Sequence, residues 1–219
     1  MIKRGMIIGN YYTNVKWTLT SWSLGDPEQI TNLVDVPGRL KGPLDLSTAQ
    51  TDGDPVYSSR TLAATFECSA GTRLERETWI SEMVNSLDGF THHIVLPDDP
   101  LHYLVARVNV KRLYNDPAHA SVQVVATCEP WRYNSAETMV TLTATETPQT
   151  ATLPNSGRLA VVPTLTVTGG EVLLAAGSYS WALSAGTYLL PDLLMLRGGQ
   201  VVTYSGSGQL TATYREAVL

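Results

Sequence analysis

The chain has 219 residues, with 15 lysines and arginines against 20 aspartates and glutamates, which gives a formal net charge of -5 at pH 7. This acidic balance argues against a protein that binds nucleic acid, because neutralising phosphates requires a basic face. No apolar run approaches the roughly 20 residues that a membrane-spanning helix needs, and residues 1–12 lack the apolar centre of a signal peptide. We therefore expect that the chain does not insert into a membrane and that it folds in a cytoplasm. Its length suffices for two domains or for one large β domain.

The first part of the sequence is typical of strands and turns. Residues 15–24 alternate apolar and polar side chains, which predicts a strand. Turn signals at Pro37-Gly38 and Gly42-Pro43 divide residues 34–46 into short extended pieces, and residues 48–55 are expected to form a polar loop. The inward side chains of the first strand would be Val15, Trp17 and Leu19.

A helix is expected at residues 72–88, directly after a strand at 60–68. Thr72 and Glu75 predict a capping box, in which the threonine hydroxyl and the glutamate carboxylate each accept from the other residue's backbone N–H. Asp88-Gly89 would end the helix, because glycine accepts the left-handed conformation that follows many helices. The expected buried stripe is Leu74, Ile80, Met83, Val84 and Leu87 with Trp79, and the expected solvated residues are Arg73, Arg76, Glu77 and Glu82.

Three more strands are expected after the helix, at residues 90–96, 101–114 and 121–128. The turns between them lie at residues 97–100 and 115–117, where proline follows aspartate. A helix inside a run of hairpins has one obvious partner, the apolar face of the sheet. The sequence therefore predicts that residues 1–134 form a β-sandwich with a single helix packed on it.

The composition changes at residues 129–134, a segment that interrupts the strand pattern. The remainder carries few charged residues, and its short runs of threonine, valine and leucine are separated by glycines at intervals typical of sandwich strands. We therefore expect a domain boundary near Asn134 and a second β-sandwich, without a helix, over residues 135–219. The whole chain is predicted to be mainly β.

One dense polar cluster could in principle bind a metal or hold an acid/base pair, and it consists of His92, His93, Asp98, Asp99 and His102. Adjacent histidines on a strand point to opposite faces, so they cannot both bind one ion. Residues 97–100 have the composition of a tight turn. The interpretation that fits the pattern better is a structural one, and the sequence predicts no metal-binding residue.

Other chemical signatures favour a protein without catalysis. Cys68 and Cys128 lie in strand-like runs and are expected to be buried apolar side chains rather than a disulfide. The chain has no Gly-x-Ser-x-Gly elbow, phosphate-binding loop or dinucleotide fingerprint, so no catalytic or cofactor-binding residue is assigned. The alternating side chains of Tyr179, Trp181 and Leu183 fit either a sugar-stacking platform or, more often, a core.

Several short motifs occur in order along the chain. They are Val-Pro-Gly-Arg-x-x-Gly-Pro-Leu-Asp-Leu at 36–46, Tyr57 and Arg60 before a strand ending Phe66-Glu67, Pro-Asp-Asp-Pro-Leu-His-Tyr-Leu-Val-Ala-Arg-Val at 97–108, Cys-Glu-Pro-Trp-Arg-Tyr at 128–133, Asn155-x-Gly157, 163–167 and Thr-Tyr-Arg-Glu at 213–216. In this order they resemble the distal tail protein (Dit) family of long-tailed, siphovirus-type bacteriophages. Two positions depart from the family pattern: Lys41 stands where a tighter turn is expected, and Trp131 where a tyrosine is commoner.

This resemblance implies a structural protein of the virion, made and assembled in the host bacterial cytoplasm. It implies a homo-hexameric ring at the distal end of the tail, between the tail tube protein and the tail-associated hub protein, which presents receptor-binding proteins and lets DNA pass only through its lumen. The first domain would form the ring and a galectin-like second domain would project outward. The alternatives are a carbohydrate-binding β-sandwich module and a hydrolase within a sandwich fold, and the absence of paired carboxylates counts against the hydrolase.

Overall fold

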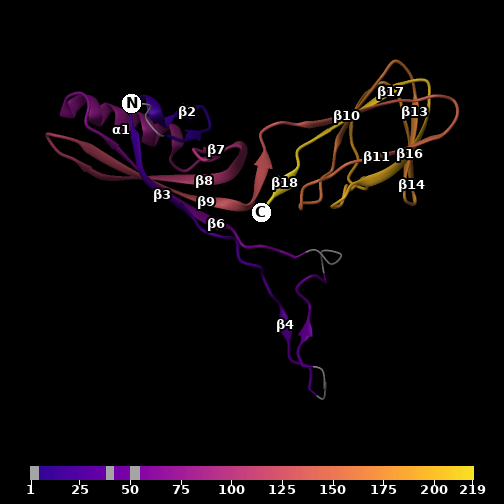
Figure 1. The fold of residues 1–219 in the computed structure, drawn as a ribbon, viewed down its shortest axis with the longest axis horizontal. Helices are drawn as coiled ribbons and strands as arrows, with labels where there is room; N and C mark the ends of the chain where they lie inside the picture. The colour runs from indigo at the N-terminus through magenta and orange to yellow at the C-terminus, as the bar shows by residue number, and fades with distance from the viewer. Residues whose placement is uncertain (1–4, 38–41, 50–54) are drawn as a thin grey trace. The chain divides into compact units, whose positions relative to one another are not determined.

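The computed structural model describes residues 5–37, 42–49 and 55–219 (Figure 1). It divides into two compact units, Met1–Arg132 and Tyr133–Leu219. The predicted mainly β fold with one helix is confirmed for the described residues. Gly38 of the first expected turn, and most of the expected polar loop at 48–55, lie outside the described residues. No helix in the described ranges is long and apolar enough to span a membrane.

One twisted sheet forms the body of the first unit. Its strands lie in the order β2-β1-β7-β8-β9-β6-β3. The first strand of the chain therefore pairs with a strand that follows the helix, with Ile7 opposite Val95. The strands are β1 (Ile7–Ile8), β2 (Tyr11–Tyr12), β3 (Thr18–Leu24), β6 (Arg60–Cys68), β7 (Thr91–Leu96), β8 (Asp99–Asn115) and β9 (Ala120–Asn134).

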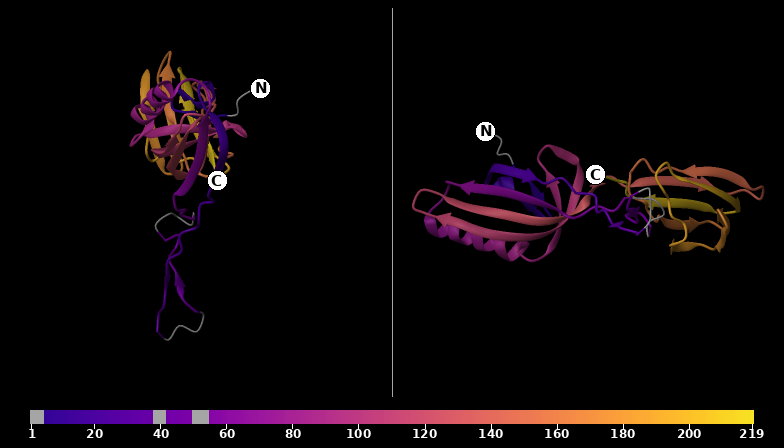
Figure 2. Two further views of the ribbon diagram at one scale, coloured as in Figure 1. Left: turned by 90° about the vertical axis from the view of Figure 1, so that its left-hand side faces the viewer. Right: turned by 90° about the horizontal axis from the view of Figure 1, so that it is seen from below.

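The helix α1 (Arg73–Leu87) lies along the strands of this sheet (Figure 2). The predicted capping box is confirmed: the backbone N–H of Glu75 donates to Thr72 Oγ1 over 3.2 Å, and the N–H of Thr72 donates to Glu75 Oε2 over 2.6 Å. Ile80, Met83 and Leu87 are buried against the sheet in one core with apolar residues of its strands. The sequence thus sets both the start of the helix and most of its buried face.

Two predictions about the faces of the helix are wrong. Leu74 was expected in the buried stripe, but its side chain is 77% exposed. Arg76 was expected in solvent, but it is 1% exposed and belongs to the buried face. The cause is helical phase, because residue 76 precedes Ile80 and Met83 by four and seven positions and therefore lies on their side of the helix.

The first predicted strand also needs correction. Residues Thr13–Val15 form a short 3-10 helix, η1, and the strand β3 begins only at Thr18. Thr13 is buried, and its hydroxyl oxygen accepts from the N–H of Met6 over 2.8 Å and donates to the carbonyl of Met6 over 2.9 Å. This local bonding holds Val15 out in solvent, while Trp17 is buried as predicted.

The strand before the predicted boundary is longer than expected. β9 continues through residues 129–134, where the sequence analysis placed a break in the pattern. A proline removes one N–H donor but its fixed φ suits extended backbone, so a single proline need not end a strand. At the end of the strand the N–H of Asn134 donates to the carbonyl of Glu216 over 2.9 Å.

The chain between β3 and β6 forms a separate hairpin, which we call the arm and define as residues 26–59. Its described residues include the strands β4 (Leu33–Val34) and β5 (Leu44–Asp45), which pair with each other in a two-stranded sheet. Figure 1 shows the two legs of the arm as thin extended segments. Among residues 34–46, the described parts 34–37 and 42–46 therefore lie on the two sides of this hairpin, and residues 38–41 lie outside the described residues.

The second unit is a sandwich of two four-stranded sheets around its own apolar core. Asn155, 1% exposed, lies in a loop of this unit and bonds three backbone groups there, since its side chain donates to the carbonyls of Leu159 and Met195 and accepts from the N–H of Gly157. One sheet has the order β10 (Thr138–Thr143), β17 (Gln209–Tyr214), β12 (Thr164–Thr168), β15 (Gly186–Leu189). The other has the order β11 (Gln149–Leu153), β16 (Gln200–Gly206), β13 (Val172–Ala176), β14 (Tyr179–Leu183). The last strand, β18 (Ala217–Val218), pairs with β9.

Candidate interaction surfaces

The two adjacent histidines of the polar cluster lie in different surroundings on β7. His92 is half-buried against Gly9, where a β-carbon would lie 2.8 Å from the histidine Nδ1, so that position requires glycine. His93 is exposed and stacks on Tyr103 with ring centroids 4.3 Å apart. The two side chains do not converge on a common point.

Two of the remaining residues of that cluster, Asp99 and His102, form a small hydrogen-bond network with Arg132. Asp99 accepts from His102 Nδ1 over 2.7 Å with one carboxylate oxygen and from Arg132 Nη1 over 3.2 Å with the other. Asp98 is exposed in the two-residue turn between β7 and β8. Within the described ranges, no group of three or more histidine, cysteine, aspartate and glutamate side chains could hold a metal ion. The network therefore orients its own members at the start of β8, and it carries no visible ligand chemistry.

Both cysteines are buried and free. They occupy opposite ends of the paired strands β6 and β9, where Cys68 lies opposite Ala120 and Cys128 opposite Arg60. Burial raises the pKa of the Cys128 thiol to about 11, although the nearby positive charge of Arg60 acts in the other direction. A thiol of this kind remains protonated at neutral pH and is a poor nucleophile.

Arg60, part of the sequence motif that precedes the strand at 60–68, is a buried charge at the base of the arm. It is 6% exposed and begins β6 directly after the arm. Within the described part of the chain, neither its Nε nor its Nη2 has a hydrogen-bond partner. Burial, and next the charge of Arg132, lower the pKa of Arg60. These two nitrogens form the edge of the guanidinium that binds carboxylates in a bidentate manner.

The arm exposes an unusual amount of apolar surface. None of its described residues is buried. Its legs are joined by a few hydrogen bonds across the hairpin, such as Ile30 N–H to the carbonyl of Val56 over 2.8 Å and Leu46 N–H to the carbonyl of Asn32 over 2.8 Å. A two-stranded hairpin with no further layer is marginally stable in water at best. The exposed aliphatic side chains are Ile30, Leu33, Val34, Val36, Leu44, Leu46 and Val56.

The arm is also acidic. Residues 26–59 carry six acidic and two basic side chains. Of these, Asp26, Glu28, Asp35 and Asp45 lie in the described part, which contains no lysine or arginine. Hydrogen bonds from the side chain and the N–H of Ser47 lower the pKa of Asp45, so this carboxylate stays charged at neutral pH. The arm thus combines aliphatic side chains with negative charge. The feature of the sequence that could have revealed this surface is a run of apolar residues among turn residues with no regular period.

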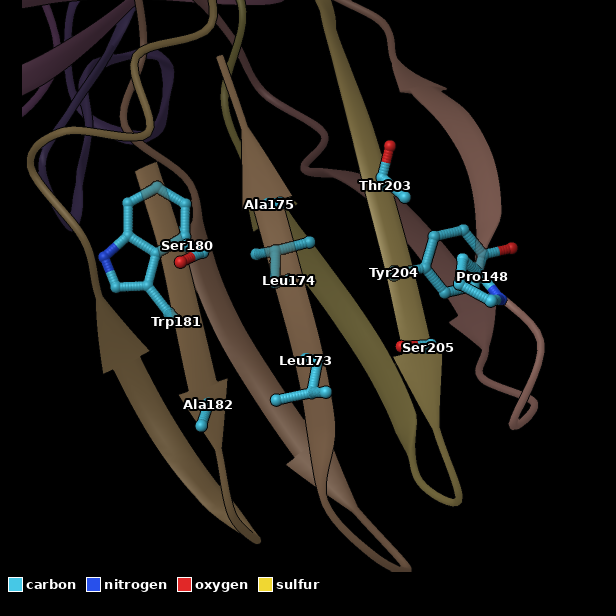
Figure 3. A pocket seen from close by; sticks show the side chains of 10 residues that line it. All are labelled: Pro148, Leu173, Leu174, Ala175, Ser180, Trp181, Ala182, Thr203, Tyr204 and Ser205. Carbon is cyan, nitrogen blue, oxygen red and sulfur yellow. The ribbon is translucent and has the colours of Figure 1, made fainter. Parts of the chain in front are cut away.

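A hollow of about 500 Å³ lies on the second unit, across β14, β13 and β16 (Figure 3). Trp181 and Tyr204 border it, but both lie opposite the buried Leu174 in the strand register and pack against the second core. Tyr179 is exposed and stacks on Trp181 with ring centroids 5.9 Å apart. The residues whose side chains alternate to the other side of the sheet, toward the hollow, are Leu173, Ala175, Ser180, Ala182, Thr203 and Ser205. The hollow therefore presents aliphatic and hydroxyl groups rather than an aromatic platform.

Comparisons with known proteins give a likeness of fold. No family model and no curated protein sequence matches the chain. Among solved structures, the crystal structure of SPP1 Dit (gp 19.1) is similar with a TM-score of 0.64, and the alignment covers 96% of this chain and 98% of that chain at 13% sequence identity. That protein is described as a paradigm of the hub adsorption apparatus in phages that infect Gram-positive bacteria. At this identity the likeness concerns the fold, and the chain has a Dit-like fold over nearly its whole length.

Proposed function

We propose that the chain is a structural, non-enzymatic protein of the hub at the distal end of a long phage tail. The observation that carries this proposal is the Dit-like fold, which extends over 96% of the chain and includes both units. In this role the protein forms a homo-hexameric ring between the tail tube protein and the tail-associated hub protein. It is a component of the virion that contacts receptor-binding proteins, and DNA passes through its lumen.

The exposed apolar surface of the arm supports the proposal that copies of the chain assemble. Monomeric soluble proteins rarely expose large contiguous apolar patches, and such patches mark interaction sites. The arm exposes seven large aliphatic side chains, from Ile30 to Val56, on a hairpin with no covering layer. A closed ring needs two different surfaces on each copy, one for each neighbour. The arm is suited to be one of them.

Native mass spectrometry and negative-stain imaging of the purified full chain test the proposal. We expect a species with six times the mass of one chain, and ring-shaped particles. A chain that stays monomeric at all accessible concentrations, without any ring, would contradict the proposal.

We further propose that the first unit forms the ring and that the galectin-like second unit projects from it. Fragments 1–132 and 133–219 are suitable for this test, because Arg215 Nη1 donates to the carbonyl of Asn134 over 3.1 Å and a cut after residue 134 would divide that contact. The first fragment is expected to assemble and the second to remain a folded monomer. Assembly of only the second fragment would overturn this division of roles.

A further inference from the structure

Arg60 is one of two charged residues that are buried in the described part of the chain, and the other is Arg76. The nitrogens Nε and Nη2 of Arg60 are closed to solvent, and neither has a hydrogen-bond partner among the described residues. Buried charges are normally paired, because a charge left without a partner in the interior strongly destabilises a fold. The chain itself thus leaves part of the hydrogen-bonding capacity of Arg60 unused.

The position of Arg60 in its strand explains why the charge is buried. β6 alternates buried and more exposed residues along its length, and Arg60 is in phase with the buried Leu62 and Ala64. This alternation directs the Arg60 side chain to the core side of the sheet, where Cys128 of β9 lies opposite it. Thr61, the next residue, points to the other face and is exposed. The backbone therefore holds the guanidinium at the buried end of the paired strands β6 and β9.

No carboxylate in the described part of the chain is bonded to this charge. The ion pairs between described residues do not include Arg60. The charged group that acts on it most is another cation, Arg132, and the effect of Asp26, which has the opposite sign, is smaller. Asp99 accepts from Arg132 Nη1 over 3.2 Å, so that carboxylate serves the other arginine. Since an arginine keeps its proton at neutral pH, Arg60 remains charged without a bonded anion.

We infer that Arg60 anchors a carboxylate-binding site at the start of β6, beside β9. Its Nε and Nη2 lie on one edge of the guanidinium and can donate two parallel hydrogen bonds to the two oxygens of a carboxylate. A carboxylate is flat and carries one negative charge, so it satisfies both nitrogens and balances the charge of Arg60. A water molecule accepts from the same nitrogens but leaves the charge uncompensated.

The site borders solvent, so a small ligand can enter it. Arg60 keeps 6% of its surface exposed, and the side chain of Arg132, whose charge acts on it, is 36% exposed. The carboxylate can come from a free organic acid or from an acidic side chain of another protein, since both supply the same chemical group. The inference goes beyond the proposed function and does not depend on the ring.

Formate, the smallest carboxylate, tests the site in the full chain at a concentration where the chain is monomeric. It replaces chloride at constant ionic strength, because a change in ionic strength would by itself alter surface electrostatics. Urea unfolding is followed by tryptophan fluorescence, and four of the five tryptophans lie in the first unit. A ligand that binds only the folded chain raises the folding equilibrium constant, and at about ten times Kd we expect about an elevenfold rise.

Three variants assign this response to the guanidinium edge. Arg60→Met removes the edge and should lose the response, while any general effect of formate on protein surfaces remains in that variant. Arg107→Met replaces an exposed arginine of β8 and should keep the full response. Arg60→Lys keeps a positive charge without the two-nitrogen edge, so we expect most of the response to be lost.

A short peptide with one glutamate distinguishes the two sources of the carboxylate. If this peptide raises the folding equilibrium constant and the same peptide with glutamine does not, the site accepts a protein side chain. A response to formate alone assigns the site to small free acids.

The outcomes separate this inference from the proposed function. No response to formate in the unchanged chain, or an equal response in Arg60→Met, would overturn the site. An equal response in Arg60→Lys would overturn the two-nitrogen mode of binding. None of these results bears on the ring, since a chain that never assembles can still bind formate and a chain that ignores formate can still assemble.

Discussion

The two buried arginines of the first unit have opposite surroundings. Arg76, at the start of the helix, is 1% exposed and donates through Nη1 and Nη2 to four backbone carbonyls. Two of those carbonyls belong to the helix entry, and the other two, of Asp116 and Pro117, belong to the turn between β8 and β9. Only its Nε lacks a partner in the described part of the chain. The charge thus joins two separate segments of the fold.

At the base of the arm, Arg60 has no such carbonyls. Its Nε and Nη2 lack any partner among the described residues, and the charged group that acts on it most is another cation, Arg132, which is itself bonded to Asp99. A buried N–H without a partner costs about 1–3 kcal/mol. The comparison teaches that the helix end of the unit is complete within one chain, whereas the arm end leaves polar groups unsatisfied and apolar groups exposed.

The largest expected loss of stability at the helix end of the unit comes from Arg76→Met. We expect the free energy of unfolding to fall by about 3–5 kcal/mol, because four carbonyls lose their donor in a site closed to water. Urea unfolding followed by tryptophan fluorescence measures the change. The control is Arg73→Met, an exposed position on the same helix, where the expected change is within about 0.5 kcal/mol. A loss of less than about 1 kcal/mol for Arg76→Met would be close to the error of such extrapolations. That result would contradict the structural role of the guanidinium.

Arg60→Met sharpens the comparison, because the expected effect has the opposite sign. Methionine removes an unpaired buried charge while keeping most of the apolar volume, so the isolated chain should be as stable as before or more stable by up to about 2 kcal/mol. The same urea experiment, performed at a concentration where the chain is monomeric, measures it. A clear loss of stability would mean that the Arg60 guanidinium is satisfied within the chain.

The last expected effect is absent at neutral pH and concerns Cys128, opposite Arg60. Its folded pKa is about 11, and an unfolded thiol titrates near 8.5, so above pH 9 the unfolded chain binds fewer protons than the folded chain. The stability contributed by the protonated thiol is complete below pH 8.5 and is lost as pH rises toward 11, by at most about 1.4 kcal/mol for each pH unit. Cys128→Ala should remove this part of the slope. An unchanged slope in that variant would assign the alkaline loss to other groups.

The sequence predicts the parts of this fold that depend on local rules. The capping box at Thr72 and the alternation of β6 are properties of a few neighbouring residues, and both are confirmed. The positions of Arg76 and Leu74 were predicted wrongly because residue type was given more weight than helical phase. Phase alone would have placed residue 76 with Ile80 and Met83 on the buried face.

The candidate surfaces were harder to predict, because each depends on residues distant in sequence. The sheet of the first unit pairs β1 with β7, with Ile7 opposite Val95, and no local pattern reveals that pairing. Arg60 is at the beginning of a strand whose alternation is visible, yet its surroundings depend on Cys128 and Arg132, which are distant in the sequence. For the arm, turn signals predicted short extended pieces, but the exposure of their aliphatic side chains follows from the absence of a covering layer.

The pairing of β1 with β7 also has a consequence for the chain as it leaves the ribosome. Ile8 meets its partner Ile94 only after the intervening residues have been made. At about 5–20 residues per second, the first strand waits roughly 4–18 s for that partner. The arm emerges in the same interval, with its aliphatic side chains exposed. Its carboxylates then act as gatekeepers, because charged residues beside an apolar segment oppose aggregation of the nascent chain.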